Sequence, residues 1–354
     1  MEGNPNQPIR VVVADDSAVM RRLIGDALRA DPRLEVVGEA GDGDAAITRC
    51  RELRADVLTL DLSMPGMNGL EALAELRRSR DRVRVVVVSA FSPSLIERAL
   101  DVLDEGATDL VAKPRPGGSF QEFGTSVVEA VVAAAAGRAA TAGASHGLRR
   151  VPMPRSTRRS ANAGRILAIA SSTGGPRALG EVVPKLGATL QAGGVIVQHM
   201  PEGFTTALAR RLDQNSQLTI REGSMGDALA PDTILIAPAG WHMRMRRGVV
   251  GLDDTPAIGG VRPRADVTIE DLVADYGARI VLVVLTGMGN DGLLGARAVR
   301  AAGGIVIAQD ERDCVVYGMP RHVVENDLAD ATGTLDELPT LIERALGTPL
   351  PRQR

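Results

Sequence analysis

RILAIASSTGGPR, residues 165–177, joins the pattern of a buried strand to the start of a helix. The apolar run Ile166 to Ala170 is typical of a strand covered on both faces, as in a parallel sheet. The hydroxyl residues that follow stand at the carboxyl end of that strand, where α/β enzymes place nucleophiles or bind anions. A helix N-cap beside a glycine turn is the alternative for this loop alone. The stretch therefore predicts an α/β domain and leaves the role of its hydroxyls open.

The bulk composition indicates an ordinary globular protein. The 354 residues are enough for two domains, and 44% of them are apolar and 24% charged. A net charge of −3 and an aromatic content of 2% give no indication of nucleic-acid binding. Cys50 and Cys314 stand far apart and form no metal-binding spacing, which favours reduced thiols. Without a signal peptide or a run long enough to span a bilayer, we expect a cytoplasmic protein with no membrane insertion.

The first 137 residues alternate strictly between strand and helix patterns. Expected strands lie at 9–14, 34–39, 57–60, 82–88 and 108–112. Expected helices lie at 17–30, 44–53, 70–77, 94–103 and 121–138. This alternation predicts a doubly wound, flavodoxin-like parallel sheet for a domain over residues 1–137.

Four of these five strands end in a polar group. Asp15 and Asp16 follow the first, Asp61 the third, Ser89 the fourth and Lys113 the fifth. Such ends converge on one crevice, where crowded carboxylates favour a hard divalent cation, Mg²⁺ for preference. Lys113 and Ser89 are suited to hold phosphoryl oxygens, with Asp61 as the acceptor carboxylate. The alternative, that each acid merely caps a helix, becomes less favoured when successive strands all carry one.

The motifs of this half resemble the response-regulator receiver domain over about residues 8–125. The residues that carry the resemblance are DDSAVMR (15–21), LDLSMPGMNGLEAL (60–73), VSA (88–90) and KP (113–114). The resemblance implies phosphorylation of Asp61 by a partner histidine kinase. One departure is Leu110, which stands where many receivers carry Tyr or Phe and puts an aromatic switch in doubt.

Residues 138–163 separate the two halves. They consist mainly of Ala, Gly, Ser, Thr, Pro and Arg, without apolar periodicity. The prolines and small residues predict a flexible linker. The clustered arginines leave a basic arm that touches nucleic acid as an alternative.

A second α/β alternation occupies residues 164–354, with expected strands at 166–170, 194–197, 233–237, 280–285 and 304–308. Ser172, His199 and Asp291 each follow the carboxyl end of one of these strands, so one parallel sheet can bring them together. An alcohol, an imidazole and a carboxylate are the groups that nucleophilic acyl transfer requires. Glycines around Met288 can turn backbone N–H groups toward an oxyanion. Taken singly, a histidine at a strand end is more often structural, and GMGND is more often an ordinary turn.

The second half resembles the catalytic domain of the chemotaxis protein-glutamate methylesterases, the CheB family. The matching motifs are SSTGGP (171–176), QHMP (198–201), RPRADV (262–267), LTGMGNDG (285–292) and CVVYGMPR (314–321). The resemblance implies that Ser172 is the nucleophile, with His199 and Asp291 completing the site and Thr173 and Met288 supporting it. In two departures, Ala170 replaces a usual glycine, and Ser171 adds a second hydroxyl that makes it a weaker rival for the nucleophile.

The implied reaction is hydrolysis of glutamate γ-methyl esters on methyl-accepting chemoreceptors, with release of methanol and no cofactor for that step. Glutamine deamidation, phosphorylation by a CheA-type histidine kinase and Mg²⁺ at Asp15, Asp16 and Asp61 are implied as well. Two alternatives stay open. The loop at Gly174 and Gly175 can belong to a phosphate-binding module, although no Walker lysine accompanies it. The chain can also be a transcriptional regulator, although its second half lacks a convincing helix-turn-helix.

Overall fold

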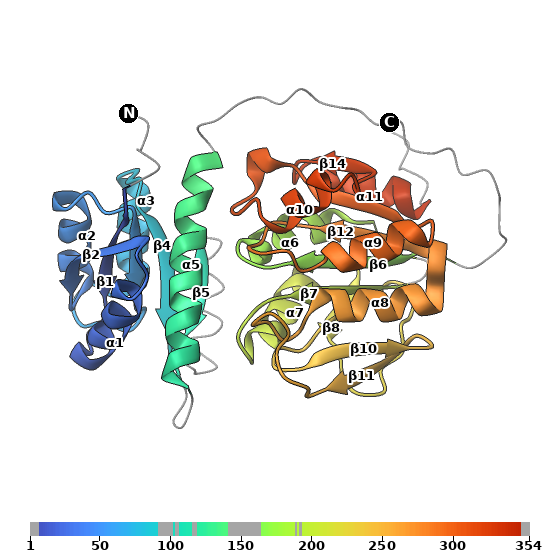
Figure 1. The fold of residues 1–354 in the computed structure, drawn as a ribbon, viewed down its shortest axis with the longest axis horizontal. Coiled ribbons are helices and arrows are strands. Elements are labelled where there is room, and N and C mark those ends of the chain that lie inside the picture. The colour runs from blue at the N-terminus through green and yellow to red at the C-terminus, as the bar shows by residue number, and fades with distance from the viewer. Residues whose placement is uncertain are drawn as a thin grey trace. The chain divides into compact units, whose positions relative to one another are not determined.

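The computed structural model describes residues 7–90, 102, 106–114, 119–140, 164–187, 190 and 193–347. Contacts divide the chain into two compact units, Met1–Ala142 and Gly143–Arg354, and both contain a sheet with helices (Figure 1). The helix expected at 94–103 lies outside the described residues except for Val102, and so do linker residues 141–163.

The first unit contains a parallel sheet of five strands in the order β2-β1-β3-β4-β5. The strands are β1 (Ile9–Ala14), β2 (Leu34–Ala40), β3 (Val57–Leu60), β4 (Arg84–Ser89) and β5 (Asp109–Ala112). The described helices are α1 (Ala18–Arg29), α2 (Gly43–Glu52), α3 (Gly69–Arg78) and α5 (Phe120–Ala140). This strand order is the flavodoxin-like one, so the predicted fold class of this half is confirmed.

Helices α1 and α5 pack together on one face of this sheet. Ile24 and Leu28 of α1 join Phe123, Val127 and Val131 of α5 in one apolar cluster with side chains of β1, β3, β4 and β5. The strands are buried because helices cover both faces of a doubly wound sheet. Polar groups at the strand ends therefore lie in the loops at one edge.

The second unit contains seven parallel strands in the order β14-β13-β12-β6-β7-β9-β8. They are β6 (Ile166–Ser171), β7 (Gly194–Gln198), β8 (Thr219–Glu222), β9 (Thr233–Ile236), β12 (Ile280–Val284), β13 (Ile305–Gln309) and β14 (Ala331–Gly333). An antiparallel hairpin of β10 (His242–Arg246) and β11 (Val249–Asp253) is separate from them. The predicted parallel α/β architecture is confirmed for this half too.

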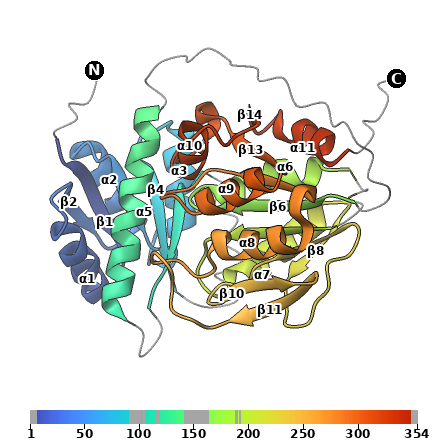
Figure 2. The same cartoon turned by 45° about the vertical axis from the view of Figure 1, so that its right-hand side comes forward.

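The helices of this unit cover both faces of the sheet. They are α6 (Gly175–Val182), α7 (Phe204–Asn215), α8 (Ala265–Tyr276), α9 (Leu293–Ala301), α10 (Met319–Glu325) and α11 (Leu338–Leu346), with short 3₁₀ turns η1 (Val183–Lys185), η2 (Gly277–Arg279) and η3 (Glu311–Asp313). Side chains of α8, α9, α10 and the hairpin share one apolar core with the sheet. Figure 2 shows α8 and α9 beside each other in front of β6.

The strand order reverses at β6. The chain builds β7, β9 and β8 on one side of β6 and then places β12, β13 and β14 on the other side. A crevice at such a switch point, outside the carboxyl ends of the strands, is where doubly wound sheets bind ligands. The loops after β6 and β12 therefore border this crevice.

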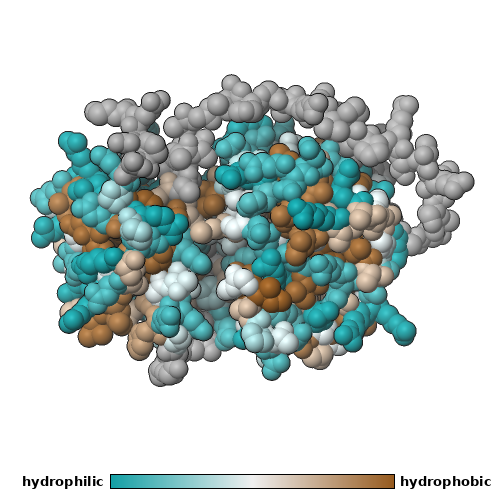
Figure 3. All heavy atoms as spheres, viewed as in Figure 1, coloured by the Kyte–Doolittle hydropathy of each residue, from teal (hydrophilic) through white to brown (hydrophobic). Residues whose placement is uncertain are grey.

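Hydrophilic and hydrophobic residues are interspersed over the face of both units that Figure 3 shows. Within the described ranges, each helix is too short or too polar to cross a bilayer.

Candidate active site

Ser172 and His199 lie side by side at the ends of neighbouring strands. The ladder between β6 and β7 pairs Ser171 with Gln198, and the His199 backbone N–H then donates to Ser171 O at 3.1 Å. On the other side, the Ser172 N–H donates to Thr286 O at 3.0 Å, which ties it to the segment after β12. The first position beyond β6 is thus held between the loops that carry the histidine and the aspartate.

Asp291 contacts the imidazole and is itself saturated with hydrogen bonds. Its Oδ2 lies 2.7 Å from His199 Nε2 and accepts from Ala265 N at 2.6 Å. Its Oδ1 accepts from Asp266 N and from Gly292 N, each at 2.9 Å. Burial opposes ionisation of Asp291, but the bonds from His199 and the backbone outweigh it and lower its pKa to about 2. The carboxylate therefore stays charged over the whole neutral range.

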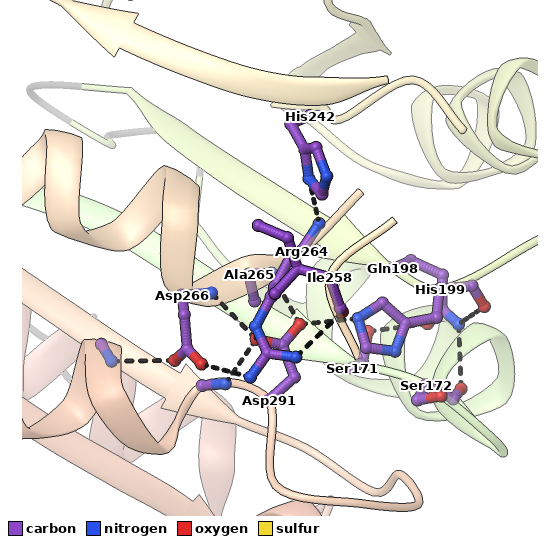
Figure 4. Close-up of polar contacts among 12 residues, drawn as sticks. Ser171, Ser172, Gln198, His199, His242, Ile258, Arg264, Ala265, Asp266 and Asp291 are labelled. Atoms are coloured by element: carbon purple, nitrogen blue, oxygen red, sulfur yellow. Dashed lines mark hydrogen bonds and ion pairs between the residues drawn. The ribbon is translucent and has the colours of Figure 1, made fainter. Parts of the chain in front are cut away.

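The two adjacent serines differ in what their hydroxyls do. Ser171 is fully buried, and its Oγ donates to Gln198 Oε1 at 2.7 Å. Ser172 is half-buried, and among the described residues its Oγ has no hydrogen-bond partner. In Figure 4 the ring of His199 lies between Asp291 and Ser172. Only the second hydroxyl is free to react.

The geometry of this edge also depends on Gln198, to which the sequence analysis gave no role. Its Nε2 donates to Ser172 O at 2.9 Å and to His199 O at 2.8 Å, while its Oε1 accepts from Ser171. Gln198 is 1% exposed, and its bond with Ser171 is made away from water. Its place in the QHMP motif was the available signal, but a sequence does not reveal which carbonyls an amide reaches.

The loop after β12 approaches Ser172 closely at Gly287. A Cβ at this position would lie 2.7 Å from Ser172 Cβ, a distance that no side chain can adopt without displacing the serine. The backbone is fixed from behind, because Gly287 N donates to Val316 O at 3.0 Å and Gly318 N donates to Gly287 O at 3.1 Å. The glycine that the sequence offers here is required for close approach.

Met288 and Thr173 border the same position. Within the described part of the chain, the Met288 backbone N–H donates no hydrogen bond. Thr173 is 7% exposed, and its carbonyl accepts from Thr286 Oγ1 at 3.0 Å, which fixes the loop after β6. A free N–H beside a fixed loop is the arrangement that an oxyanion can use.

The first unit brings a second set of polar groups together. Lys113 Nζ lies 2.7 Å from Asp15 Oδ2 and 2.8 Å from Asp61 Oδ2. Burial raises the pKa of Asp15 above its usual value, and Lys113 offsets only part of this effect. Burial alone would lower the pKa of Lys113, but its bonds to Asp15 and Asp61 raise it. Ser89 is buried at the end of β4, the strand between those that precede Asp61 and Lys113.

This set fits a divalent cation. Carboxylate oxygens of Asp15, Asp16 and Asp61 lie within 4.8 Å of one another. Among the described residues, Asp61 Oδ1 and Ser89 Oγ are buried without a hydrogen-bond partner. Orphaned oxygens at this depth are costly unless a ligand satisfies them, and Mg²⁺ with a phosphoryl group offers such contacts. Leu110 is buried in β5, so this position has no aromatic ring to move.

The structure describes two further histidines, His242 and His322. His242 begins β10 rather than following a sheet strand, and its Nδ1 accepts from Arg264 N at 3.2 Å. His322 lies in α10, and His146 lies outside the described residues. Within the described chain, His199 is therefore the histidine beside Ser172.

Two family models match the chain. The model described as CheB methylesterase matches residues 167–342. The model described as response regulator receiver domain matches residues 11–121. Together they cover both units.

Relatives match over nearly the full length. A protein-glutamate methylesterase/protein-glutamine glutaminase from Symbiobacterium thermophilum is 40% identical over 370 residues, which cover 98% of this chain and 99% of that protein. A protein of the same name from Pyrococcus abyssi is 38% identical, and the match covers 96% of this chain and 94% of that protein. The crystal structure of the Thermotoga maritima CheB methylesterase catalytic domain has a TM-score of 0.50 and 41% identity, and it covers 52% of this chain and 99% of that one.

Proposed function

The chain belongs to the CheB family of protein-glutamate methylesterases, and we propose that Ser172, His199 and Asp291 carry its reaction. It has the receiver domain that makes such an esterase responsive to phosphorylation. The observation that carries the residue assignment is the 2.7 Å bond between His199 Nε2 and Asp291 Oδ2 beside a serine with a free hydroxyl. We assign catalysis to residues 164–354, regulation to residues 1–137 and the linker to residues 138–163.

The proposed reaction runs through an acyl-enzyme. Ser172 Oγ attacks the γ-ester carbonyl while His199 takes the hydroxyl proton, and the charged Asp291 stabilises the imidazolium. The imidazolium then protonates the leaving methoxide, so methanol departs and the glutamyl group stays on the serine. Water attacks this ester with His199 again as base, and the products are the glutamate carboxylate and free Ser172.

The tetrahedral intermediates place a negative charge on the former carbonyl oxygen. We assign its stabilisation to the Met288 N–H, with Thr173 holding the loop on the other side. Loss of one oxyanion donor typically costs about 10²- to 10³-fold in rate. A glutamine side chain offers the same carbonyl, with ammonia in place of methanol as the leaving group, and so the glutaminase activity named in the relatives requires no additional residue.

Regulation is assigned to Asp61. Its unpartnered Oδ1 is the oxygen proposed to accept the phosphoryl group, with Lys113 and Ser89 binding phosphoryl oxygens. Mg²⁺ held by Asp15, Asp16 and Asp61 would supply positive charge there. The partners are a CheA-type histidine kinase and methyl-accepting chemoreceptors, whose cytoplasmic helices carry the esters; the proposed location is therefore the cytoplasm.

The test is methanol release from a methylated chemoreceptor by matched serine variants. Ser172→Ala is expected to abolish turnover, because the neighbouring Ser171 hydroxyl is already bonded to Gln198. Ser171→Ala removes a buried bond to Gln198 and is expected to keep most of the activity. Full activity in Ser172→Ala would overturn the assignment, as would loss of activity in Ser171→Ala alone.

A further inference from the structure

Arg264 connects three segments at the back of the candidate active site. Its Nη2 donates to Asp266 Oδ2 at 2.9 Å, its Nη1 donates to Ile258 O at 3.1 Å, and its Nε lies 3.5 Å from Asp291 Oδ1. The side chain is 13% exposed. Figure 4 shows the guanidinium in this position, close to Asp291. All three nitrogens of its planar guanidinium take part in these contacts.

The N-terminal ends of helices α8 and α9 are each capped by a carboxylate that belongs to the other helix or its leading residues. Asp291, just before α9, accepts from the N–H groups of Ala265 and Asp266 in the first turn of α8. Asp266 Oδ1 in turn accepts from Gly295 N in the first turn of α9, at 2.9 Å. A carboxylate is stabilised at a helix N-terminus because the N–H groups there lack helical partners. The position of Asp291 is thus set by both helices.

This reciprocal capping places the carboxylates of Asp266 and Asp291 close together and away from water. Asp266 is 3% exposed and Asp291 4% exposed. Burial raises the pKa of Asp266, and repulsion by Asp291 adds to this effect, while Arg264 opposes it. Among the described side chains, Arg264 is the one that pairs with both carboxylates. A cation that contacts both of two buried carboxylates stabilises the ionised form of each.

We propose that Arg264 and Asp266 are positioning residues. They fix the Asp291 carboxylate against His199, and their charges set the electrostatic potential at the His199 ring. This inference rests on the proposed function. Among the described residues, the charged or titratable groups near the His199–Asp291 pair are Arg264, Asp266 and His242. His242 Nδ1 accepts from the Arg264 backbone N–H. Arg264 acts through Asp291 and needs no contact with substrate.

The experiment measures the pH profile of kcat/KM for methanol release by full-length variants. Activity requires neutral His199, so the acid limb marks where the imidazolium forms. Arg264→Gln removes a positive charge, which makes the imidazolium easier to form and moves the acid limb up by on the order of half a pH unit. Asp266→Asn removes a negative charge and moves the limb down by a similar amount. Arg264→Lys keeps the charge but not the three contacts, so we expect an unmoved limb and a roughly tenfold lower kcat.

Arg300→Gln is the matched control. Arg300, in α9, pairs with the buried Asp330, which precedes β14. Asp330 also accepts from Val306 N at the start of β13, so this pair does not belong to the site. This variant is expected to lose stability without moving the acid limb. Fluorescence of Trp241, the single tryptophan of the chain, reports folding of the esterase unit in each variant. If Arg264→Gln does not fold, the test rests on the other two variants: an unmoved acid limb with lowered kcat in Arg264→Lys, and a lowered acid limb in Asp266→Asn.

Acid limbs that coincide with the wild-type limb in Arg264→Gln and Asp266→Asn, or that move in the same direction, would overturn the positioning role. Failure of the proposed function gives another pattern, in which the wild-type chain releases no methanol or Ser172→Ala retains its activity.

Discussion

Both units place buried aspartates at the carboxyl ends of parallel strands, but the two sets of carboxylates have different partners. In the receiver unit, Asp61 shares one lysine with Asp15, and Asp61 Oδ1 has no hydrogen-bond partner among the described residues. In the esterase unit, both oxygens of Asp291 accept backbone N–H groups, and Oδ2 also contacts His199. The same residue type at the same place in a sheet is therefore unsaturated in one unit and saturated in the other.

This difference separates two kinds of chemistry. A carboxylate with a free buried oxygen can bind a cation or form a new bond, because it has hydrogen-bonding capacity left. A carboxylate whose oxygens are all engaged cannot attack a substrate without losing those bonds, and it acts by orienting its neighbour. Counting the partners of each oxygen distinguishes an acceptor aspartate from an orienting one where the sequence context does not.

The largest expected effect comes from Asp291→Asn. The amide would turn an N–H₂ group toward the backbone N–H donors or toward His199, and it would favour the wrong imidazole tautomer. We expect kcat for methanol release to fall by roughly 10³- to 10⁴-fold, as is typical for the orienting member of such a triad. A fall of less than tenfold would mean that saturation of this carboxylate does not serve catalysis.

Asp61→Asn tests the unsaturated carboxylate, and a smaller effect is expected. Basal methanol release should stay within about twofold of wild type, since the esterase groups are untouched. Stimulation by a small-molecule phosphodonor with Mg²⁺ should disappear, because an amide cannot form an acyl phosphate. Comparison with Asp16→Asn, which changes the exposed member of the cluster, separates acceptor from cation ligand. Phosphodonor stimulation that survives in Asp61→Asn would remove the acceptor role.

The smallest expected effect is on stability at low pH. The pKa of Asp291 in the folded chain, about 2, lies below the ordinary aspartate value of 3.8. Its carboxylate therefore stabilises the fold fully above pH 3.8, and this contribution is lost as the pH falls toward 2. Urea unfolding followed by Trp241 fluorescence should show wild type more stable than Asp291→Asn by about 2 kcal/mol at pH 6. That advantage should shrink at pH 3, and an advantage that grows there would contradict this sign.

The sequence predicts the sheets well because their strands are continuous apolar runs. β1 and β3 have the expected bounds, and β6, β7 and β12 differ from expectation by one residue at one end. β8 (TIRE) and β10 (HMRMR) were missed, because an edge strand and a hairpin carry charged residues and lack such a run. A continuous apolar run indicates a strand that is buried on both faces, whereas β8 and β10 are covered on one face only.

The candidate sites follow from the sequence only in part. Strand ends indicated Ser172, His199 and Asp291, because parallel strands share an edge. The family resemblance already favours Ser172 over Ser171, and the coordinates add the physical reason, since the Ser171 hydroxyl is bonded to Gln198. Arg264 and Asp266 act through contacts 25 to 29 residues away along the chain, and local pattern does not report such contacts.

The side chain of Gln198 has a consequence for precision. One rigid amide group joins the carbonyls of Ser172 and His199, so it behaves as a molecular spacer between two loops that covalent structure leaves independent. A thermal motion that separates Ser172 from His199 must stretch the hydrogen bonds that Gln198 Nε2 makes to their carbonyls. The Gln198 amide cannot rotate to compensate, because Ser171 Oγ is bonded to its Oε1. The range of distances between the Ser172 hydroxyl and the His199 ring is thereby narrowed by a residue to which we assign no chemical step, and a shorter asparagine at 198 would widen this range.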